Sequence, residues 1–403
     1  MLCEAFGNTN IRGFKLKILH IAPYFPSKNA VHAGGVCMAH EIETLKALGH
    51  TVYSCTFYQK QYDANCLIED ENYYTVKLTK IKKIINCLLH PFTAPYFASR
   101  FSGAFYRRLV KIIKSKKIEA IHAEYAAMGL YVKLKKKFPN LKFNLVLHDV
   151  TYQSYLRKFE SSRGLKRLLY SVNKKLVFKN EKSAVDKADC ILTFCDKDSK
   201  LVKQYYNPKQ VKEINTYFGL DKVLKYDFQA SYYDRQGICF MGQMGRKENE
   251  EAAIRLITIY NQIKGGLLDN KLYIFGSHPS EKLKSYASND VEIFGYVENL
   301  EETMSKCKVA VFPLMSGAGI KIKVLTSMAL GIPTITTDVG AEGIDEQGEY
   351  LVLANDDEVI KQKLLELVNN ASIYNEVSDK IARYVIEKFS WQQTIDVFSE
   401  LYR

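Results

Sequence analysis

The fold of this chain is decided by residues 312–340, which read FPLMSGAGIKIKVLTSMALGIPTITTDVG. The pattern predicts a short apolar strand, a loop of small residues, a helix and a second strand, over 309–312, 316–319, 324–330 and 334–337. A glycine and a proline directly after the helix are typical of a helix end. The segment therefore predicts one strand–helix–strand unit of a parallel sheet.

The loop and the start of this helix carry groups that suit a phosphate anion. Ser316, Gly317 and Gly319 are small, so backbone N–H groups can approach an anion closely, and a helix N-terminus adds partial positive charge. Lys321 and Lys323 add full charges at the same point. The pattern predicts a diphosphate site, although an ordinary glycine-containing loop of a parallel sheet fits the same spacing.

The whole segment resembles the donor-binding segment of the retaining GT-B glycosyltransferases of group 1, called glycosyltransferase family 4. The form P-L-x-S-G-A-G-I-K-I-K-V-L-x-x-M-A-x-G-x-P is common in one branch of that family. The resemblance implies a nucleotide-sugar donor, with Lys323 stabilising the diphosphate as it leaves. It also implies retention at the anomeric carbon through front-face attack.

This sequence departs from the family at two positions that usually carry glutamate. Ser316 stands near the first of them, which meets the donor sugar, and Thr326 replaces the second, which meets the ribose. Thr326 can donate one hydrogen bond to a hydroxyl but cannot accept two, as a carboxylate can. Glu342 is a nearby substitute carboxylate. These departures motivate a second hypothesis, a catalytically inactive binding or regulatory subunit of a glycosyltransferase complex.

Composition indicates an ordinary globular protein. The 403 residues suggest two or three domains, with 47% hydrophobic and 25% charged residues. No apolar run is long enough for a transmembrane helix, and no secretory signal is expected at the start. The nine cysteines are scattered, which predicts reduced thiols in a cytoplasmic protein and no structural zinc.

Strand and helix patterns alternate throughout, which predicts an α/β protein with two Rossmann-like domains whose parallel sheets face each other across a cleft. The expected divisions are an acceptor-side domain over 1–216, a nucleotide-sugar donor domain over 217–386, and a C-terminal helix over 387–403 that crosses back to the first domain. The join is expected near 217–221.

Two further motifs are candidates for the donor domain. Arg246 and Lys247 follow the predicted strand 238–241, where a cationic pair could hold a diphosphate by charge-assisted hydrogen bonds. A solvated basic turn fits these residues equally well. Tyr296 lies in a segment that resembles the family's nucleotide-base contact, although a surface tyrosine is the alternative.

Candidates in the first domain follow predicted strands. Gly34 and Gly35 precede a helix and offer an anion site, or an ordinary tight turn. The family often has a histidine facing the donor sugar at the position of His148, and Asp149 is expected to orient it or to bind acceptor hydroxyls. Glu124 is an acceptor-side candidate.

Charge is concentrated in the first domain, where residues 1–220 have a net charge of +20 within a chain total of +13. The segments 100–117 and 163–182 are predicted amphipathic helices whose apolar stripes face the core. Their basic residues predict attraction to an anionic membrane or to a polyanionic acceptor. Nucleic acid is not expected, because no known binding module accompanies the charge.

The predicted reaction moves a sugar from a nucleotide diphosphate to an acceptor hydroxyl of a glycan, a lipid-linked glycan or a surface polysaccharide. Arg246 and Lys323 would neutralise the leaving group, so neither a metal nor another cofactor is expected. A sugar-nucleotide epimerase is a further alternative. A nicotinamide-dependent oxidoreductase is disfavoured, because no G-x-G-x-x-G motif follows the first strand.

Overall fold

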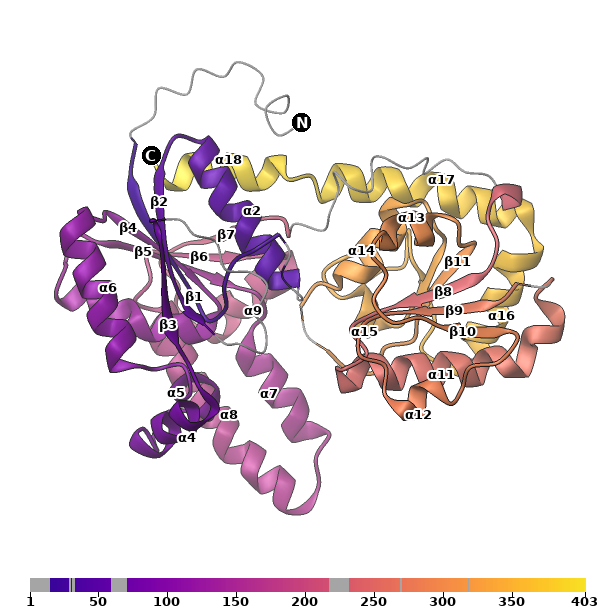
Figure 1. Cartoon of the computed structure of the whole chain (residues 1–403), viewed down its shortest axis with the longest axis horizontal. Helices are drawn as coiled ribbons and strands as arrows, with labels where there is room; N and C mark the ends of the chain where they lie inside the picture. Colours follow the sequence, from indigo (N-terminus) through magenta and orange to yellow (C-terminus); the bar gives the residue numbers. More distant parts are fainter. Residues whose placement is uncertain are drawn as a thin grey trace. The chain divides into compact units, whose positions relative to one another are not determined.

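The computed structural model describes residues 15–28, 30, 33–58, 71–216, 232–268, 270–317 and 319–403. Its contacts divide the chain into two compact units (Figure 1). Unit 1 comprises Met1–Ile214 and Trp391–Arg403, and unit 2 comprises Asn215–Ser390. The predicted join at 217–221 lies outside the described residues.

Unit 1 contains a seven-stranded parallel sheet in the order β3-β2-β1-β4-β5-β6-β7. Its strands are β1 (Lys17–Ala22), β2 (Thr51–Tyr58), β3 (Tyr73–Lys77), β4 (Ala120–Glu124), β5 (Lys142–Leu147), β6 (Cys190–Thr193) and β7 (Val211–Glu213). Its helices are α2 (Ala33–Ala47), α4 (Lys80–Leu89), α5 (Pro95–Ala98), α6 (Gly103–Lys116), the 3-10 helix η1 (Ala126–Lys136), α7 (Thr151–Glu160), α8 (Gly164–Val185), α9 (Asp196–Tyr205) and α18 (Gln392–Leu401).

Unit 2 contains a six-stranded parallel sheet in the order β10-β9-β8-β11-β12-β13. Its strands are β8 (Ile238–Met241), β9 (Leu272–Phe275), β10 (Val291–Ile293), β11 (Val309–Phe312), β12 (Thr334–Thr336) and β13 (Val352–Leu353). Its helices include α11 (Lys247–Ile263), α12 (Glu281–Lys284), α13 (Leu300–Ser305), α14 (Ile322–Ala329), α15 (Asp338–Ala341), α16 (Asp357–Asn369) and α17 (Ala371–Lys388), with short 3-10 turns η2 (Tyr232–Asp234) and η3 (Lys264–Gly266).

Both sheets reverse their strand order at one point, between β1 and β4 in unit 1 and between β8 and β11 in unit 2. Ligands of open α/β sheets bind beyond the carboxyl ends of the strands at such a reversal. The prediction of two Rossmann-like parallel sheets is therefore confirmed. Each sheet also marks where its ligand is expected.

Most strands are buried on both faces, as parallel sheets with helices on each side require. Every residue of β8 and β11 is buried. The edge strand β3 differs, because its residues are half-buried or exposed and its sequence, YYTVK, carries little apolar signal. The sequence analysis missed β3 for this reason.

The two predicted amphipathic helices of unit 1 behave differently. In α6 the apolar residues Phe105, Leu109 and Ile112 are buried, as expected. The prediction that the whole stripe of α8 faces the core is wrong, because its N-terminal half projects beyond the core as a hairpin with α7 (Figure 1). The exposed apolar residues of that half are Leu165, Leu168, Leu169 and Val172.

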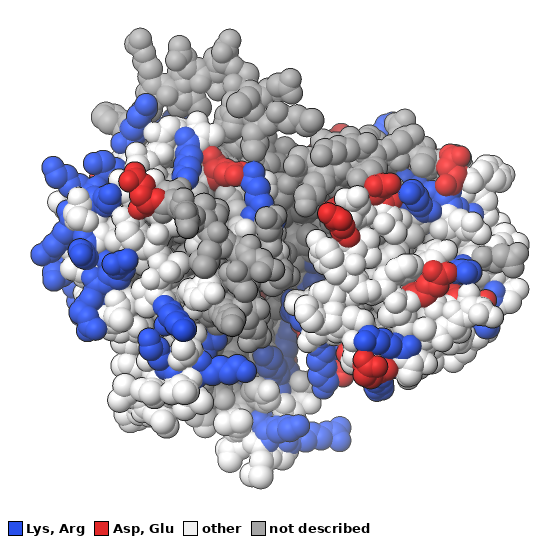
Figure 2. Space-filling view, viewed as in Figure 1, with Lys and Arg blue, Asp and Glu red and all other residues white. Residues whose placement is uncertain are grey.

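Basic side chains predominate on the face of unit 1 that Figure 2 shows, whereas both signs alternate on unit 2. Within the described ranges, no helix combines the length and the apolar character needed to cross a bilayer. The cysteines of the described ranges are all free.

Glu181 holds the α7–α8 hairpin in place. Its fully buried carboxylate accepts hydrogen bonds from the backbone N–H groups of Thr151 and Tyr152, at 3.0 and 2.8 Å, and from the Tyr206 hydroxyl at 2.6 Å. It thereby satisfies the N-terminus of α7, whose own N-cap residue, Val150, supplies no capping side chain.

Glu181→Gln is expected to lower the free energy of unfolding by about 1–3 kcal/mol, because an amide accepts at one oxygen and leaves a buried donor unpaired. Urea denaturation measures the change. The control is Glu160→Gln at an exposed position of α7. Equal stability of the two variants would show that Glu181 does not hold the hairpin.

Candidate functional site

Three cations gather at the strand reversal of unit 2. Arg246 lies in the loop after β8, while Lys321 and Lys323 lie at the start of α14, after β11. Because β8 and β11 are neighbours, their carboxyl ends bring these loops together. Arg246 and Lys321 are close enough to Lys323 for their charges to affect its protonation.

Lys323 is the most perturbed cation of this group. Burial, followed by repulsion from Arg246 and Lys321, lowers the pKa of its ammonium to about 7, with Glu248 opposing the shift. The Nζ atom donates a hydrogen bond to Asn249 Oδ1 at 2.6 Å and lies 5.0 Å from the centroid of the Phe240 ring. A partly buried amine held among other cations is poised to accept an anion.

Asn249, which the sequence analysis did not select as a site residue, connects the two loops. Its Nδ2 donates to the carbonyl of Gln243 at 2.9 Å, while its Oδ1 accepts from Lys323. A Cβ on Gly242 would lie 2.9 Å from the Asn249 side chain, so the loop needs glycine there. The sequence offered only the position of Asn249, next to the basic pair.

The glycine loop after β11 requires its glycines for conformational reasons. Gly317 and Gly319 have φ angles of 138° and 68°, which L-residues with a Cβ rarely adopt. The ammonium of Lys321 donates to the Gly319 carbonyl at 2.6 Å and lies 4.0 Å from Glu342. Glu342 thus places a carboxylate beside the loop, as the sequence analysis considered. Ala318 lies outside the described residues.

Two helices begin at this edge with cations and without a side-chain cap. Arg246 is the N-cap residue of α11 and Lys321 is that of α14. Positive charge at a helix N-terminus is unfavourable, because the helix dipole is also positive there. A bound anion would offset both the charge of the side chain and the dipole. Arg246 has partial compensation from an ion pair with Glu248.

The other predicted donor residues have less direct placements. Ser316 is exposed at the loop, and Tyr296 is 81% exposed. Lys247 is also exposed and pairs with Glu251 at 3.4 Å, on the surface of α11. Thr326 is 5% exposed, and its hydroxyl donates to the Ile322 carbonyl within α14 at 2.9 Å. The Thr326 proton is therefore engaged inside the helix.

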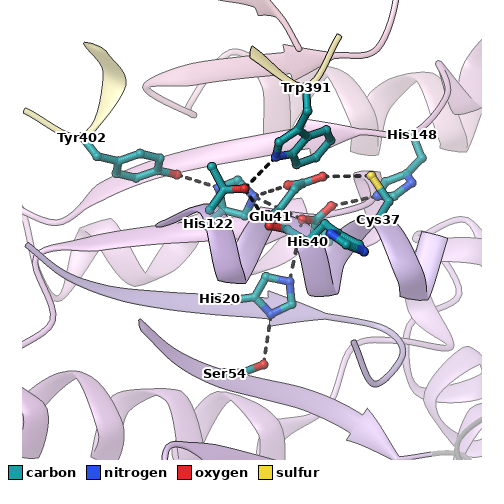
Figure 3. Close-up of polar contacts among 11 residues, drawn as sticks. His20, Cys37, His40, Glu41, Ser54, His122, His148, Trp391 and Tyr402 are labelled. Carbon is teal, nitrogen blue, oxygen red and sulfur yellow. Dashed lines mark hydrogen bonds and ion pairs between the residues drawn. The ribbon is translucent and has the colours of Figure 1, made fainter. Parts of the chain in front are cut away.

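A buried network of histidines and glutamates lies at the strand reversal of unit 1 (Figure 3). His148, directly after β5, donates from Nε2 to Glu124 Oε2 at 2.8 Å. His122 on β4 donates from Nε2 to Glu124 Oε1 at 3.1 Å and to Glu41 Oε2 at 2.8 Å. Its Nδ1 lies 2.6 Å from the Tyr402 hydroxyl, which α18 supplies.

Glu124 differs from its predicted role in the acceptor site. It is the last residue of β4 and is fully buried, so its oxygens face histidines rather than a ligand. Although burial opposes ionisation, hydrogen bonds from His122 and His148 hold the pKa of Glu124 well below its usual range, and His20 Nε2 lies 3.7 Å from Oε1. Glu124 contacts His148, and Asp149 Oδ1 accepts from the Thr151 hydroxyl at 3.4 Å.

Proton affinities in this network are strongly shifted. Burial, followed by the negative charge of Glu124, raises the pKa of Glu41 to about 7. Burial opposes protonation of His122, yet Tyr402 and the two carboxylates raise its pKa well above the usual value. The arrangement stabilises an imidazolium between two carboxylates. Among the described residues, Glu41, His122 and Glu124 are also spaced to hold a metal ion, with ligand atoms within 4.8 Å of one another.

The sequence analysis did not select Glu41, His122 or Tyr402. Alternation along β4 offered one signal, because His122 and Glu124 are two residues apart and therefore share a face of the strand. No local pattern connects Tyr402, 280 residues further along the chain, to His122.

Gly34 and Gly35 lie in the first turn of α2 and not before the helix as predicted, and Gly34 is close to Tyr125 and His148. A Cβ at Gly34 would lie 1.9 Å from the Tyr125 hydroxyl and 3.6 Å from His148 Cε1. The Tyr125 ring stacks on the His148 ring at 3.8 Å with an interplanar angle of 2°. Gly35 is buried and accepts from the Ser27 backbone N–H at 3.1 Å, which closes the loop after β1.

Tyr125 has a φ of 67°, a strained conformation for a residue with a Cβ. Strain of this kind persists where the surrounding packing fixes it, and it is common at functional sites. Gly34, Glu124, Tyr125 and His148 therefore form one packed cluster, which we call the His148 cluster.

Most of unit 2 matches a known protein family. Residues 235–370 match the family described as glycosyl transferases group 1. The chain carries a group 1 glycosyltransferase domain. The cation cluster at the reversal of β8 and β11 therefore lies in this glycosyltransferase domain.

Two relatives match nearly the whole length of the chain. An uncharacterised 44.6 kDa protein of the cps region of Klebsiella pneumoniae is 24% identical over 399 residues, covering 93% of this chain and 96% of that protein. An uncharacterised glycosyltransferase of Methanocaldococcus jannaschii is 22% identical over 404 residues, covering 94% and 96%.

Solved structures establish the fold of the chain. Sucrose-phosphate synthase from Thermosynechococcus elongatus has a TM-score of 0.71 at 15% identity, covering 96% of this chain and 98% of that one. WaaG, a glycosyltransferase of lipopolysaccharide biosynthesis, has a TM-score of 0.66 at 13% identity, covering 96% and 99%. Anabaena HepE with UDP and glucose has a TM-score of 0.64 at 11% identity, covering 96% and 100%. The predicted GT-B fold is thus confirmed.

Gly34→Ala is expected to lower the thermal midpoint, because the new methyl group would clash with the Tyr125 hydroxyl. Tyr125→Phe removes that hydroxyl, so the double variant should recover much of the loss. A double-mutant cycle of unfolding free energies measures the coupling. Additive effects of the two substitutions would contradict the contact.

Proposed function

We propose that this protein is a glycosyltransferase that moves a sugar from a nucleotide-diphosphate sugar to an acceptor hydroxyl. The observation that carries the proposal is the cation cluster of Arg246, Lys321 and Lys323 at the strand reversal of a group 1 glycosyltransferase domain. A nucleotide diphosphate is the anion that this charge and this family favour.

Lys323 and Arg246 stabilise the leaving diphosphate in the proposed reaction. As the glycosidic bond breaks, negative charge develops on the phosphate oxygens, and preorganised cations in a partly buried site stabilise that charge. The uncapped start of α14 supplies backbone N–H groups for the same oxygens. Since protein cations fill this role, the proposed mechanism uses no metal, and we propose retention at the anomeric carbon.

The remaining candidates hold the donor or the acceptor. The donor phosphates lie near Gly317, Gly319 and Lys321. The sugar lies near Ser316 and Glu342. The rest of the nucleotide lies near Tyr296, Thr326 and Lys247. In unit 1, Gly34 and Gly35 lie in the first turn of α2, and the half-buried His148 faces the transferred sugar. Asp149 remains an acceptor-side candidate.

Glu124 acts as a positioning residue in this proposal. Its carboxylate accepts from His148 Nε2 and so determines which imidazole nitrogen is left for a substrate, Nδ1. His122 and Glu41 behind it fix the charge of the carboxylate. A buried glutamate at the end of β4 therefore supports His148 in this proposal, in place of the acceptor contact that the sequence suggested.

The substrates and location proposed from the sequence fit this reading. The acceptor is a glycan, a lipid-linked glycan or a growing surface polysaccharide, and the protein acts in the cytoplasm at the inner face of the membrane. The alternative, an inactive binding subunit, is favoured by one observation: the Thr326 hydroxyl is engaged within α14, where the family places a ribose-binding carboxylate.

A thermal-shift and calorimetric screen of UDP, GDP, ADP and their sugar conjugates, with and without EDTA, tests donor binding first. The nucleotides of one base are expected to raise the thermal midpoint of the protein selectively, and this shift should persist in the presence of EDTA. No shift with any nucleotide would contradict the donor site. A shift without turnover across a broad acceptor panel would favour the inactive subunit.

Lys323→Ala should lower the turnover number by a factor of about 100 or more, because it removes a donor that stabilises the leaving group. The effect is measured from initial rates with the sugar nucleotide whose base the screen identifies. The matched control is Lys306→Ala, whose side chain is 72% exposed and lies outside the proposed site, so its effect should be much smaller. Near-normal turnover in the Lys323 variant would remove this lysine from the mechanism.

Binding of the nucleoside diphosphate is expected to take up a proton at pH 8. The pKa of Lys323 is about 7 in the free protein, so the amine is mostly neutral at pH 8, and a bound anion raises this pKa. Affinity should therefore fall as pH rises from 7 to 9. Calorimetry in buffers of different ionisation enthalpy measures the uptake, which Lys323→Met should abolish. Identical uptake in that variant would assign the proton to another group.

A further inference from the structure

Helix α4 exposes an entire apolar face. Its apolar residues recur with the spacing of one helix face, and none of the residues of α4 is buried. They are Ile81, Ile84, Ile85, Leu88 and Leu89, between 46% and 75% exposed, followed by Phe92 at 81%. A helix with this pattern normally buries the apolar face, so its exposure indicates that the face has a partner.

The N-terminal half of α8 repeats the arrangement. Leu165, Leu168, Leu169 and Val172 follow the same spacing and are 86%, 65%, 60% and 54% exposed. The buried residues of α8 all lie in its C-terminal half, from Val177 onward. Two separate helices of unit 1 therefore present uncovered apolar faces.

The two faces belong to one end of unit 1. The short helix α5 packs against both α4 and α8. The backbone N–H of Ala94, directly before α5, donates to Asn180 Oδ1 of α8 at 2.9 Å. Figure 1 shows α4 and the α7–α8 hairpin projecting from the same end of the unit. We call the two apolar faces and their basic flanks the α4–α8 surface.

The charges beside these faces have a single sign. Helix α4 carries Lys80, Lys82 and Lys83 and no acidic residue, and α8 carries none before Glu181. Burial, with repulsion from Arg100 and Lys80, lowers the pKa of Lys83, so the cations of this surface repel one another. The basic residues of the exposed half of α8 are Lys166, Arg167, Lys174 and Lys175.

We propose that the α4–α8 surface docks on an anionic phospholipid bilayer, with the apolar faces entering the headgroup region and the lysines contacting lipid phosphates. Helices with an apolar face and a lysine-rich polar face bind membranes in this orientation. A second copy of the chain is disfavoured, because it would bring the same positive charge to the contact. An anionic bilayer supplies both an apolar interior and complementary charge.

This inference identifies the surface for the membrane location proposed above and does not depend on sugar transfer. If the surface is correct, an acceptor embedded in a membrane would reach the protein at this end of unit 1. Vesicle binding and nucleotide binding are measured separately, so the failure of one proposal is distinguishable from the failure of the other.

Co-sedimentation of the full chain with vesicles tests the proposal. The vesicles are phosphatidylcholine alone, or phosphatidylcholine with about one third of the anionic lipid phosphatidylglycerol. We expect binding to the anionic vesicles, at least tenfold weaker binding to neutral ones, and weakening in high salt. Absence of binding to anionic vesicles would overturn the proposal.

Two sets of variants separate the apolar and the electrostatic contributions. Ile84→Ser with Leu88→Ser, and Leu165→Ser with Leu168→Ser, should each weaken binding about tenfold or more. Replacing the three lysines of α4 by glutamine should also weaken binding about tenfold or more, since each positive charge changes the affinity for an anionic membrane roughly fivefold. Apart from the half-buried Lys83, these side chains are exposed, so the thermal midpoint and the nucleotide-induced shift should not change.

Matched controls come from unit 2. Leu268→Ser removes an apolar side chain that is 63% exposed, and glutamine at Lys282, Lys284 and Lys306 removes three exposed lysines. Both controls should bind vesicles as the wild type does. Vesicle binding by the α4 and α8 variants equal to that of the wild type would overturn the assignment of this surface to lipid. A concentration-dependent dimer that the serine variants abolish would overturn it too.

Discussion

Parallel pairing of β8 with β11 is the constraint on which the proposed donor site depends. The pairing, with Cys239 opposite Ala310, places two strands that are far apart in sequence side by side and pointing the same way. The loops that follow them must then meet at one edge, and each loop leads into a helix N-terminus. Arg246 and Lys323 become neighbours because of this topology. The same edge also collects two uncapped helix starts, so the sheet concentrates positive potential before any ligand is considered.

The two units treat buried charge in opposite ways. In unit 2 burial, followed by repulsion from Arg246 and Lys321, lowers the pKa of the Lys323 ammonium to about 7. In unit 1 two carboxylates, those of Glu41 and Glu124, flank His122 and stabilise it as an imidazolium. An incomplete site favours an anion from outside. The paired charges of unit 1 instead fix the orientation of the partly exposed His148 through Glu124.

The C-terminal segment shows how this network depends on residues distant in sequence. After α17 ends at Lys388, the chain continues into α18, which belongs to unit 1. There the Trp391 indole donates to the Thr44 hydroxyl at 2.7 Å, and Tyr402 reaches His122. The last residues of the chain thereby complete the polar network of the first unit.

The sequence by itself determined the fold class and the cationic loop of the donor domain. Alternating apolar strands and helices, glycines at 317 and 319, and lysines at 321 and 323 are local signals, because each follows from the backbone or charge needs of a few adjacent residues. Tertiary structure alone decided which residues meet. Asn249 joins Lys323, Tyr125 covers His148, and Glu124 turns inward to three histidines through contacts that no local spacing encodes. It also decided burial: periodicity gave α6 and α8 the same amphipathic pattern, but a periodic stripe specifies a face and not its partner, and only α6 and the end of α8 found a core to cover it.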